Sequence, residues 1–196
     1  PLTPHSSLAP TVIQLTATPL SARDFADYGQ VIAFPSSSET MGIAANQGTA
    51  RRINYAAHLS NLRAASNETS RAAQANLALF RCEPPAALKD ATHFHVRLLE
   101  RHRWSTQAFL PVASTPSHPP DDVTHGYLVV VALNGPDNRP DLSTLAAFRA
   151  TARQGINYNA NVWHHPMVVL KTPMDFACLV WENGVAEEDC EEVNLP

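Results

Sequence analysis

Glu100 and His102 stand two positions apart, and Gln107 follows five residues after His102. Another pair of histidines, His164 and His165, occurs late in the chain. Because side chains alternate along a strand, Glu100 and His102 would face one side, whereas only one of two adjacent histidines can do so. Carboxylate, imidazole and amide groups can hold a divalent metal ion or move protons to and from a substrate. We therefore predict a catalytic or metal site formed by Glu100, His102, Gln107 and His164.

The spacing of these residues resembles that of cupins, in which a His-x-His-x(3,4)-Glu strand pair meets a later Pro-x-Gly-x-x-His strand. In this resemblance Glu100 and His102 take the two histidine positions, and Gln107 takes the position of the glutamate. The later strand corresponds to residues 159–164, with Asn161 where glycine is usual. Asparagine tolerates a positive φ better than most other residues, so this replacement is physically reasonable.

His93 and His95 offer a rival match, since His93-x-His95-x(4)-Glu100 follows the same pattern letter for letter. Positions 94, 96 and 98 carry Phe, Val and Leu, so the apolar face of this strand is the one that also carries Glu100 and His102. His93 and His95 then lie on the opposite, polar face. A glutamate and a histidine in a core-facing row need partners, because burying them unpaired is costly. We therefore place Glu100 and His102, not His93 and His95, in the site.

The elements around these residues read mainly as short strands. Sixteen prolines and 7 glycines in 196 residues interrupt the chain too often for a helical bundle. Apolar runs and alternation predict strands at residues 30–34, 49–56, 75–82, 127–133, 156–158, 167–171 and 175–181, with two more between 92 and 111. Capping residues predict helices at 22–28 and 141–153. The expected fold class is mainly β, a cupin-type double-sheet β-barrel (jelly-roll-like) with a few short helices.

Three regions of the chain are predicted to differ in organisation. Residues 1–15 are expected to be a flexible leader, since the first ten are rich in Pro and Ser and lack the layout of a signal peptide. Residues 16–196 are expected to form a single cupin-type catalytic domain, which is an ordinary length for one core. The Pro- and Asp-rich stretch near 113–125 reads as a loop insertion.

Composition and charge exclude several functional classes. The net charge is -4 and no basic stripe is present, which counts against a nucleic-acid partner. No run of 18 apolar residues occurs, so no membrane span is expected. The 3 cysteines form no C-x-x-C pair and are too few for a disulfide framework, which favours a reducing, cytoplasmic setting. The chain has 9 histidines, which indicates metal binding or acid–base chemistry on a small molecule.

Several longer segments together resemble one enzyme family. The most specific are ERH followed by STQAF and Pro within 99–111, and WHHP at 163–166. Their order and spacing resemble ureidoglycolate lyase, long named ureidoglycolate hydrolase, a cupin-fold family of allantoin and purine breakdown. The resemblance runs from about residue 20 to residue 192. It rests on segments 46–52, 99–111, 128–132, 154–158, 162–166 and 175–176.

The resemblance implies that (S)-ureidoglycolate is split into glyoxylate and urea. This reaction needs a base, a proton donor, a carboxylate clamp and a group that holds the developing oxyanion. Arg52 would be the clamp, because a planar guanidinium can grip a carboxylate with two hydrogen bonds, and Arg51 would replace it if the strand register shifts by one. Glu100 would be the base or a metal ligand. Gln107 would be a neutral ligand or a hydrogen-bonding partner of the substrate amide.

The remaining roles that the resemblance implies concern the late strands. His102 and His164 would face one another as metal ligands or as an acid–base pair. Tyr158 and Asn157 would line the pocket, and Trp163 would form an apolar wall. A divalent metal, nickel or another, would act as a Lewis acid on the hydroxyl and carboxylate oxygens, and a metal-free site is the alternative. A homodimer is expected for this family type.

Two other functions remain open at this stage. The set of Glu100, His102 and His164 is also the two-histidine, one-carboxylate combination that iron dioxygenases use, so an iron dioxygenase or an isomerase on the same fold is one alternative. A cupin that binds a small ligand without catalysis is the other.

Overall fold

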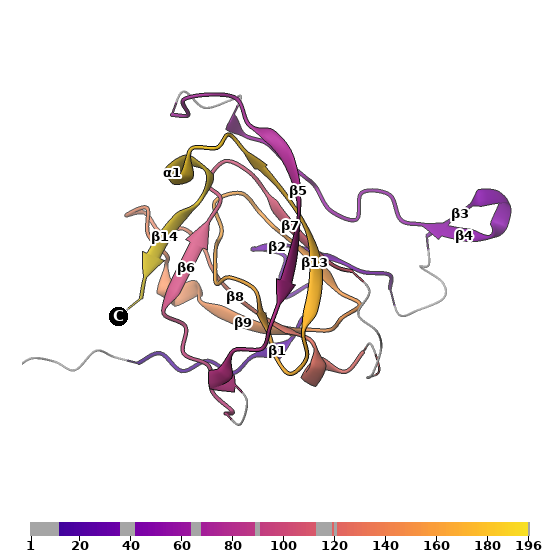
Figure 1. Ribbon diagram of the computed structural model, residues 1–196, viewed down its shortest axis with the longest axis horizontal. Helices are drawn as coiled ribbons and strands as arrows, with labels where there is room; N and C mark the ends of the chain where they lie inside the picture. Colours follow the sequence, from indigo (N-terminus) through magenta and orange to yellow (C-terminus); the bar gives the residue numbers. More distant parts are fainter. Residues whose placement is uncertain are drawn as a thin grey trace, which may run out of the picture.

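The computed structural model describes residues 12–35, 42–63, 68–88, 91–112, 119 and 121–195, and in them the chain forms two main β-sheets (Figure 1). The seven-stranded sheet contains, in order, β1 (Thr18–Pro19), β9 (Ala146–Ala150), β8 (Tyr127–Ala132), β11 (Trp163–His164), β6 (Leu98–Arg101) and β14 (Glu191–Asn194), with β12 (Val168–Val169) beside β8. The five-stranded sheet contains β2 (Gly29–Ile32), β10 (Gly155–Tyr158), β7 (Gln107–Val112), β13 (Met174–Glu182) and β5 (Gln74–Cys82).

The core lies between the two sheets. Val129, Val131 and Phe148 enter it from the seven-stranded sheet, and Phe109 and Phe176 enter it from the five-stranded sheet. These side chains occupy alternate positions of their strands, as expected where one face of a sheet is buried. The fold is mainly β with the cupin-type double sheet that the sequence predicted.

A separate hairpin projects from this double sheet. It consists of β3 (Ile43–Ala45) and β4 (Ala50–Arg52), joined by the turn Asn46–Gly48, and among the described residues its two strands pair only with each other. Figure 1 shows this hairpin standing well away from the two sheets. The strand predicted at 49–56 is therefore shorter and carries Arg51 and Arg52 outside the core layers.

Helices are few and short in the described part of the chain. The α-helix α1 (Ala186–Asp189) lies just before β14, and 3-10 turns include Asn46–Gly48, Ala86–Leu88, Val123–His125 and Leu142–Thr144. None of the helices within the described ranges is long and apolar enough to cross a membrane.

The helix predicted at 141–153 is wrong. Asp141 does cap a turn, because its carboxylate accepts a hydrogen bond from the Ser143 N–H, but Leu145 is extended and β9 follows. β9 pairs with both β8 and β1, and Phe148 and Ala150 are buried against the core. Helix propensity is a weak preference that such pairing and burial override.

The helix predicted at 22–28 is a series of turns instead. Its capping interaction does form, since the Asp24 N–H donates to Ser21 Oγ at 3.1 Å. The chain then turns into β2 at Gly29, whose N–H reaches the Phe25 carbonyl oxygen at 3.0 Å. Of the predicted leader, residues 1–11 lie outside the described residues, as does most of the predicted insertion (113–118 and 120).

Candidate active site

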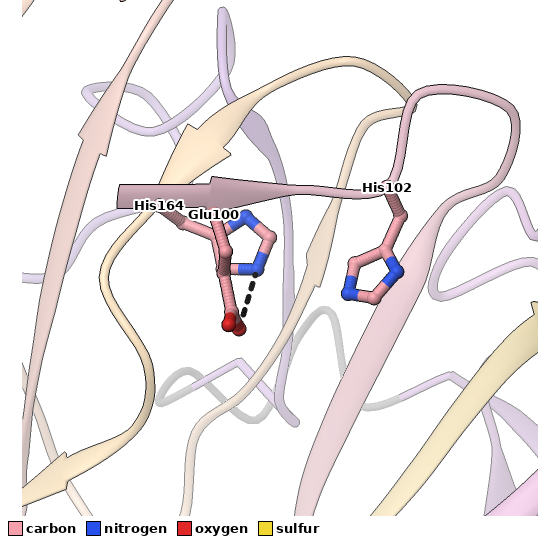
Figure 2. Close-up of side chains that lie close together, drawn as sticks. All are labelled: Glu100, His102 and His164. Carbon is pink, nitrogen blue, oxygen red and sulfur yellow. Dashed lines mark ion pairs between the residues drawn. The ribbon is translucent and has the colours of Figure 1, made fainter. Parts of the chain in front are cut away.

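Glu100, His102 and His164 come together on the seven-stranded sheet, on its core-facing side (Figure 2). Glu100 lies on β6 and His164 lies directly opposite on β11. Their side chains approach to 3.5 Å between His164 Nε2 and Glu100 Oε1. One ligand atom of each of the three residues lies within 4.8 Å of the others. Glu100 and His102, two positions apart, thus form one compact cluster with the distant His164.

A tight turn brings His164 to this position. Asn161 has a φ of 71°, so it occupies the left-handed conformation that was inferred for it from its place in the cupin-like pattern. Its backbone N–H donates to the carbonyl oxygen of His102 at 2.9 Å. Its side-chain oxygen accepts a hydrogen bond from Arg101 Nη1 at 2.7 Å. Asn161 therefore ties the segment that carries His164 to the end of β6.

Both histidines are held through Nδ1. His102 Nδ1 lies 2.7 Å from the carbonyl oxygen of Asp189, and His164 Nδ1 lies 3.0 Å from that of Val162. Because a carbonyl oxygen only accepts hydrogen bonds, each Nδ1 must carry the proton. In the neutral rings Nε2 is then an acceptor, and both Nε2 atoms are buried without a hydrogen-bond partner. Two lone pairs and one carboxylate consequently converge without a hydrogen-bond donor among them.

Such a set of atoms fits a divalent metal ion. Histidines that bind metals almost always donate their second ring N–H to a carbonyl or carboxylate, as His102 and His164 do here. Gln107 lies at the start of β7, on the same face as the core residue Phe109, and its Oε1 atom is buried without a hydrogen-bond partner. Glu100, His102 and His164 thus form a group that could hold a metal ion, to which Gln107 could offer a neutral oxygen.

Burial acts on the protonation of this cluster. Burial disfavours the charged form of Glu100, but the approach of His164 to 3.5 Å and the nearby histidine charges outweigh this, so the pKa of Glu100 lies below its ordinary value. Burial, followed by repulsion from His164, lowers the pKa of His102 from 6.5 to about 4. Near neutral pH the cluster therefore contains a carboxylate and a neutral His102.

Tyr158 lies beside His164. Its ring stacks on that of His164, with centroids 4.0 Å apart and planes at 11°. Tyr158 is on β10, in the facing sheet, and it is fully buried, which raises its pKa well above 10. The ring therefore orients His164 and remains a phenol at neutral pH.

Asn157 and Trp163 are turned away from the cluster. Asn157 precedes Tyr158 on β10, so alternation places it on the outer face, where it donates to Gln30 Oε1 at 2.7 Å and to the His58 carbonyl oxygen at 3.2 Å. Trp163 precedes His164 and packs on the opposite side of its sheet with Leu99. The predicted pocket-lining role of Asn157 and the apolar wall of Trp163 are therefore not formed.

Arg52 is also apart from the cluster. It is exposed on the projecting hairpin and contributes to a cavity of about 740 Å³ beside β2, whose lining includes Val31 and Gln154 but neither histidine of the site. Arg51 is exposed on the same strand. Neither arginine reaches Glu100 within one chain, so the predicted carboxylate clamp is not formed there.

Comparisons with known proteins place the chain in one family. The family model described as ureidoglycolate lyase matches residues 12–196. The chain belongs to the ureidoglycolate lyase family. Among curated relatives named ureidoglycolate lyase, the protein from Schizosaccharomyces pombe is 32% identical, covering 91% of this chain and 90% of its own. That from Saccharomyces cerevisiae is 32% identical with coverages of 92% and 94%, and that from Salmonella typhimurium is 33% identical with 94% and 96%.

The family resemblance did not reveal the residues that support the site from behind. Arg101 is fully buried on the outer face of β6, its guanidinium 4.3 Å from the centre of the Trp163 ring. It donates to the side-chain oxygens of Asn134 and Asn138 as well as to Asn161, and it pairs with Glu191. The sequence did contain a signal for Arg101. It stands between Glu100 and His102, so alternation makes it face away from the site. The predicted outward position of His93 and His95 is confirmed, since both are exposed.

Proposed function

We propose that this member of the ureidoglycolate lyase family splits (S)-ureidoglycolate into glyoxylate and urea. The observation that carries the proposal is the buried pair of Glu100 and His164, with His102 beside it, in a chain matched by the family over residues 12–196. A carboxylate and a lone-pair-bearing imidazole side by side can take up and return a proton, which is what this reaction asks of the enzyme.

The reaction can be written with one proton that changes place. The carbinol carbon of the substrate carries a hydroxyl group, a carboxylate and the urea nitrogen. Glu100 in its charged form, or His164 through Nε2, accepts the hydroxyl proton while the aldehyde carbonyl forms and the C–N bond breaks. The same group, or its neighbour 3.5 Å away, then returns the proton to the leaving nitrogen. The protein ends in the protonation state in which it began.

The other residues of the site would position the substrate. Tyr158 keeps the His164 ring in place by stacking on it. Gln107, whose Oε1 atom has no hydrogen-bond partner, can accept a hydrogen bond from the urea amide. Burial of the cluster excludes water and thereby strengthens each electrostatic interaction within it.

A divalent ion, nickel or another, is proposed for the same cluster. Glu100, His102 and His164 would hold it, with Gln107 as a neutral fourth ligand. When bound, the ion would supply Lewis-acid polarisation of the hydroxyl and carboxylate oxygens. Glu100, His102 and His164 would then all be ligands, so none of the three would act as the base.

The test is to follow glyoxylate release from racemic ureidoglycolate by the purified protein, with and without added divalent metal. Release above the spontaneous rate, consuming at most half of the racemate, is the expected result. The same three residues would suit an iron dioxygenase, so oxygen uptake is measured in parallel with ferrous iron. Oxygen uptake without glyoxylate release would replace the lyase proposal by that alternative. The absence of both activities would favour a cupin that only binds its ligand.

A homodimer in the cytoplasm is proposed as the working form. Its support is the outer face of the five-stranded sheet, where Leu77 and Leu79 on the edge strand β5 are 70% and 78% exposed and Leu110 is exposed on β7, the next strand but one. Exposed apolar side chains on a sheet edge favour pairing with a second copy. The three cysteines are all free thiols, in keeping with a reducing compartment.

A further inference from the structure

A substrate with a carboxylate needs a cation, and the strands of the double sheet provide none on their inner face. Within the described ranges three arginines lie on these strands, Arg81, Arg101 and Arg149. Arg81 alternates with Phe80 and Arg149 with Phe148, whose rings pack inward, so both arginines point outward. Arg101 lies on the outer face of β6, behind Glu100.

The other buried guanidinium near the site is already engaged. Arg63 donates to the Asp189 carboxylate at 2.6 Å and to the Glu188 carbonyl oxygen at 2.9 Å. Asp189 is the residue whose carbonyl oxygen holds His102. Removing Arg63 from this pair would leave a buried carboxylate uncompensated, so Arg63 stabilises the wall of the site and is not free to bind a substrate.

The surroundings of Glu100 are acidic. Glu100, Cys190 and Glu192 have side-chain atoms within 4.8 Å of one another. Burial and then the charges of Glu100, Glu192 and Glu182 raise the pKa of the Cys190 thiol to about 12, which locates all three carboxylates close to it. Glu182 and Glu192 form no ion pair with a lysine or arginine among the described residues. The formal charge of these three carboxylates exceeds what a divalent ion would offset, so an anionic substrate would be repelled here unless further positive charge is brought to the site.

The projecting hairpin carries positive charge that is not used within the chain. Arg51 and Arg52 are exposed, and neither has an ion pair or a side-chain hydrogen bond in the described part of the structure. Three successive residues of the turn, Asn46, Gln47 and Gly48, have positive φ values of 48°, 58° and 93°. An isolated two-stranded hairpin is only marginally stable, and positive φ at non-glycine residues adds a cost. A defined hairpin of this kind is expected to dock against another surface.

The hairpin cannot serve the site of its own chain. In the register of β2 and β10, Gly29 pairs with Tyr158, next to the site, and Ile32 pairs with Gly155, at the other end of the strand. The hairpin follows β2 and so starts from the end that lies away from Tyr158. Figure 1 shows it extending further outward from there. The acceptor of this arm must therefore be another molecule.

We propose that the β3–β4 hairpin of one copy reaches the Glu100–His102–His164 site of a second copy, where Arg51 and Arg52 bind the substrate carboxylate. The inference rests on the lyase function proposed above. The basic arm matches the acidic surroundings of Glu100, and in a two-fold dimer each copy would give its arm to the other and receive one in return. A guanidinium pair also suits a carboxylate through parallel hydrogen bonds. Both sites are then complete only in the dimer.

The decisive experiment uses a heterodimer of two damaged chains. One chain carries Arg51→Ala and Arg52→Ala and keeps its histidines, whereas the other carries His164→Ala and keeps its arm. The chains bear different affinity tags, are co-expressed, and are purified over both tags. One of the two sites then combines an intact cluster with an intact arm, so glyoxylate release is expected at about half the wild-type rate per dimer. The assay is run at a substrate concentration well below the KM of the arm variant, where both parents are slow, and a heterodimer no faster than its parents would overturn the proposal.

The parent variants and a charge-matched control complete the design. The arm variant is expected to raise KM by about 10- to 100-fold, the usual worth of charge-assisted hydrogen bonds. A control with Arg23→Ala and Arg139→Ala removes two exposed charges elsewhere and should keep the wild-type KM. An arm variant with unchanged KM would contradict the proposal.

A second readout does not depend on the enzymatic activity. Sedimentation at several concentrations should show a dimer whose dissociation constant rises about 10-fold or more in the arm variant, because the arm contacts the second copy. If the wild-type protein is inactive but the dimer dissociation constant still rises in the arm variant, the proposed function is overturned and the arm contact is retained. A wild-type protein that is active as a monomer would overturn the arm contact and retain the function.

Discussion

His164 Nε2 and Glu100 Oε1 lie 3.5 Å apart on paired strands, and the only proton on the His164 ring in its neutral form is at Nδ1, which faces the Val162 carbonyl oxygen. Two acceptors at this separation need something positive between or upon them. That can be a proton on Nε2, which makes an ion pair, or a metal ion shared with His102. Both states leave Glu100 charged, and they make different predictions for variants.

Replacing Glu100 by glutamine should abolish most of the activity. Glu100→Gln keeps the shape of the side chain but removes the charge that accepts a proton or binds a metal, so kcat is expected to fall by about 100- to 10,000-fold. The measurement is glyoxylate release, together with thermal unfolding to show that the protein remains folded. Glu187→Gln removes an exposed carboxylate of α1 that lies outside the cluster and serves as the control. Equal losses in the two variants would mean that general acidity, not Glu100, matters.

Metal binding should require the inward residues and not the rival motif. Calorimetric titration of chelator-treated protein with nickel should show a single site, weakened at least about 10-fold in His102→Ala and His164→Ala, because each loses a ligand. The double variant His93→Ala/His95→Ala should bind nickel as the wild type does, since both side chains are exposed away from the cluster. If that double variant lost the metal while the two inward variants retained it, the rival motif would be the metal site.

The stability of the protein should depend on pH through His102. Its pKa is lowered to about 4 in the folded state, from an ordinary 6.5. Between these values the unfolded chain binds a proton that the folded chain does not, so stability is full above pH 6.5 and falls as the pH drops toward 4. The total effect is on the order of 3 kcal/mol. Glu100, with a lowered pKa, loses its contribution only at lower pH.

Urea unfolding of the metal-free protein at pH 5 and pH 7.5 measures this effect. His102→Gln should reduce the difference in unfolding free energy between the two pH values, because glutamine does not titrate. His58→Gln replaces an exposed histidine and should leave the difference unchanged. A pH difference that persists in His102→Gln would assign it to another group.

The inward face of the site could be predicted from sequence because it depends on alternation. The row predicted from residue 94 onward is longer than the strand, because β6 spans only Leu98–Arg101 and Val96 packs against the outer cluster of Leu99 and Trp163. Within β6 alternation does hold, since Leu99 faces outward and Glu100 faces inward beside His164. Adjacent residues of a strand face opposite sides. Asn157 therefore cannot line the pocket when Tyr158 faces it, and Trp163 cannot line it when His164 does. The sequence interpretation grouped these adjacent residues by proximity and so assigned both sides of a strand to one pocket.

Other features depended on contacts that no local pattern contains. The Arg101 network joins Asn134, Asn138, Asn161 and Glu191, which come from separate loops and strands. The segment 146–150 became a strand because β8 and β1 flank it on both sides, although its alanines suit a helix equally well. The direction of the hairpin follows from where β2 ends, and that depends on the pairing of β2 with β10.

The conformation of Asn161 should control activity through the position of His164. Asn161→Ala keeps a Cβ atom at a φ of 71° and loses the hydrogen bond to Arg101, so it should destabilise the fold by about 2–4 kcal/mol and lower kcat. Asn161→Gly removes the backbone strain and loses only the hydrogen bond, so its loss in both measurements should be smaller.

Asn138 provides a matched control for this prediction. It also has a positive φ, 62°, and its side-chain oxygen also accepts from Arg101, at 3.0 Å, but its turn follows β8 and carries no residue of the site. Asn138→Ala should therefore destabilise the protein to a similar degree while the folded enzyme keeps its kcat. Comparing kcat with the free energy of unfolding for the three variants separates positioning of His164 from general stability. A kcat that falls equally in Asn138→Ala and Asn161→Ala would show that the Asn161 turn has no particular role in placing His164.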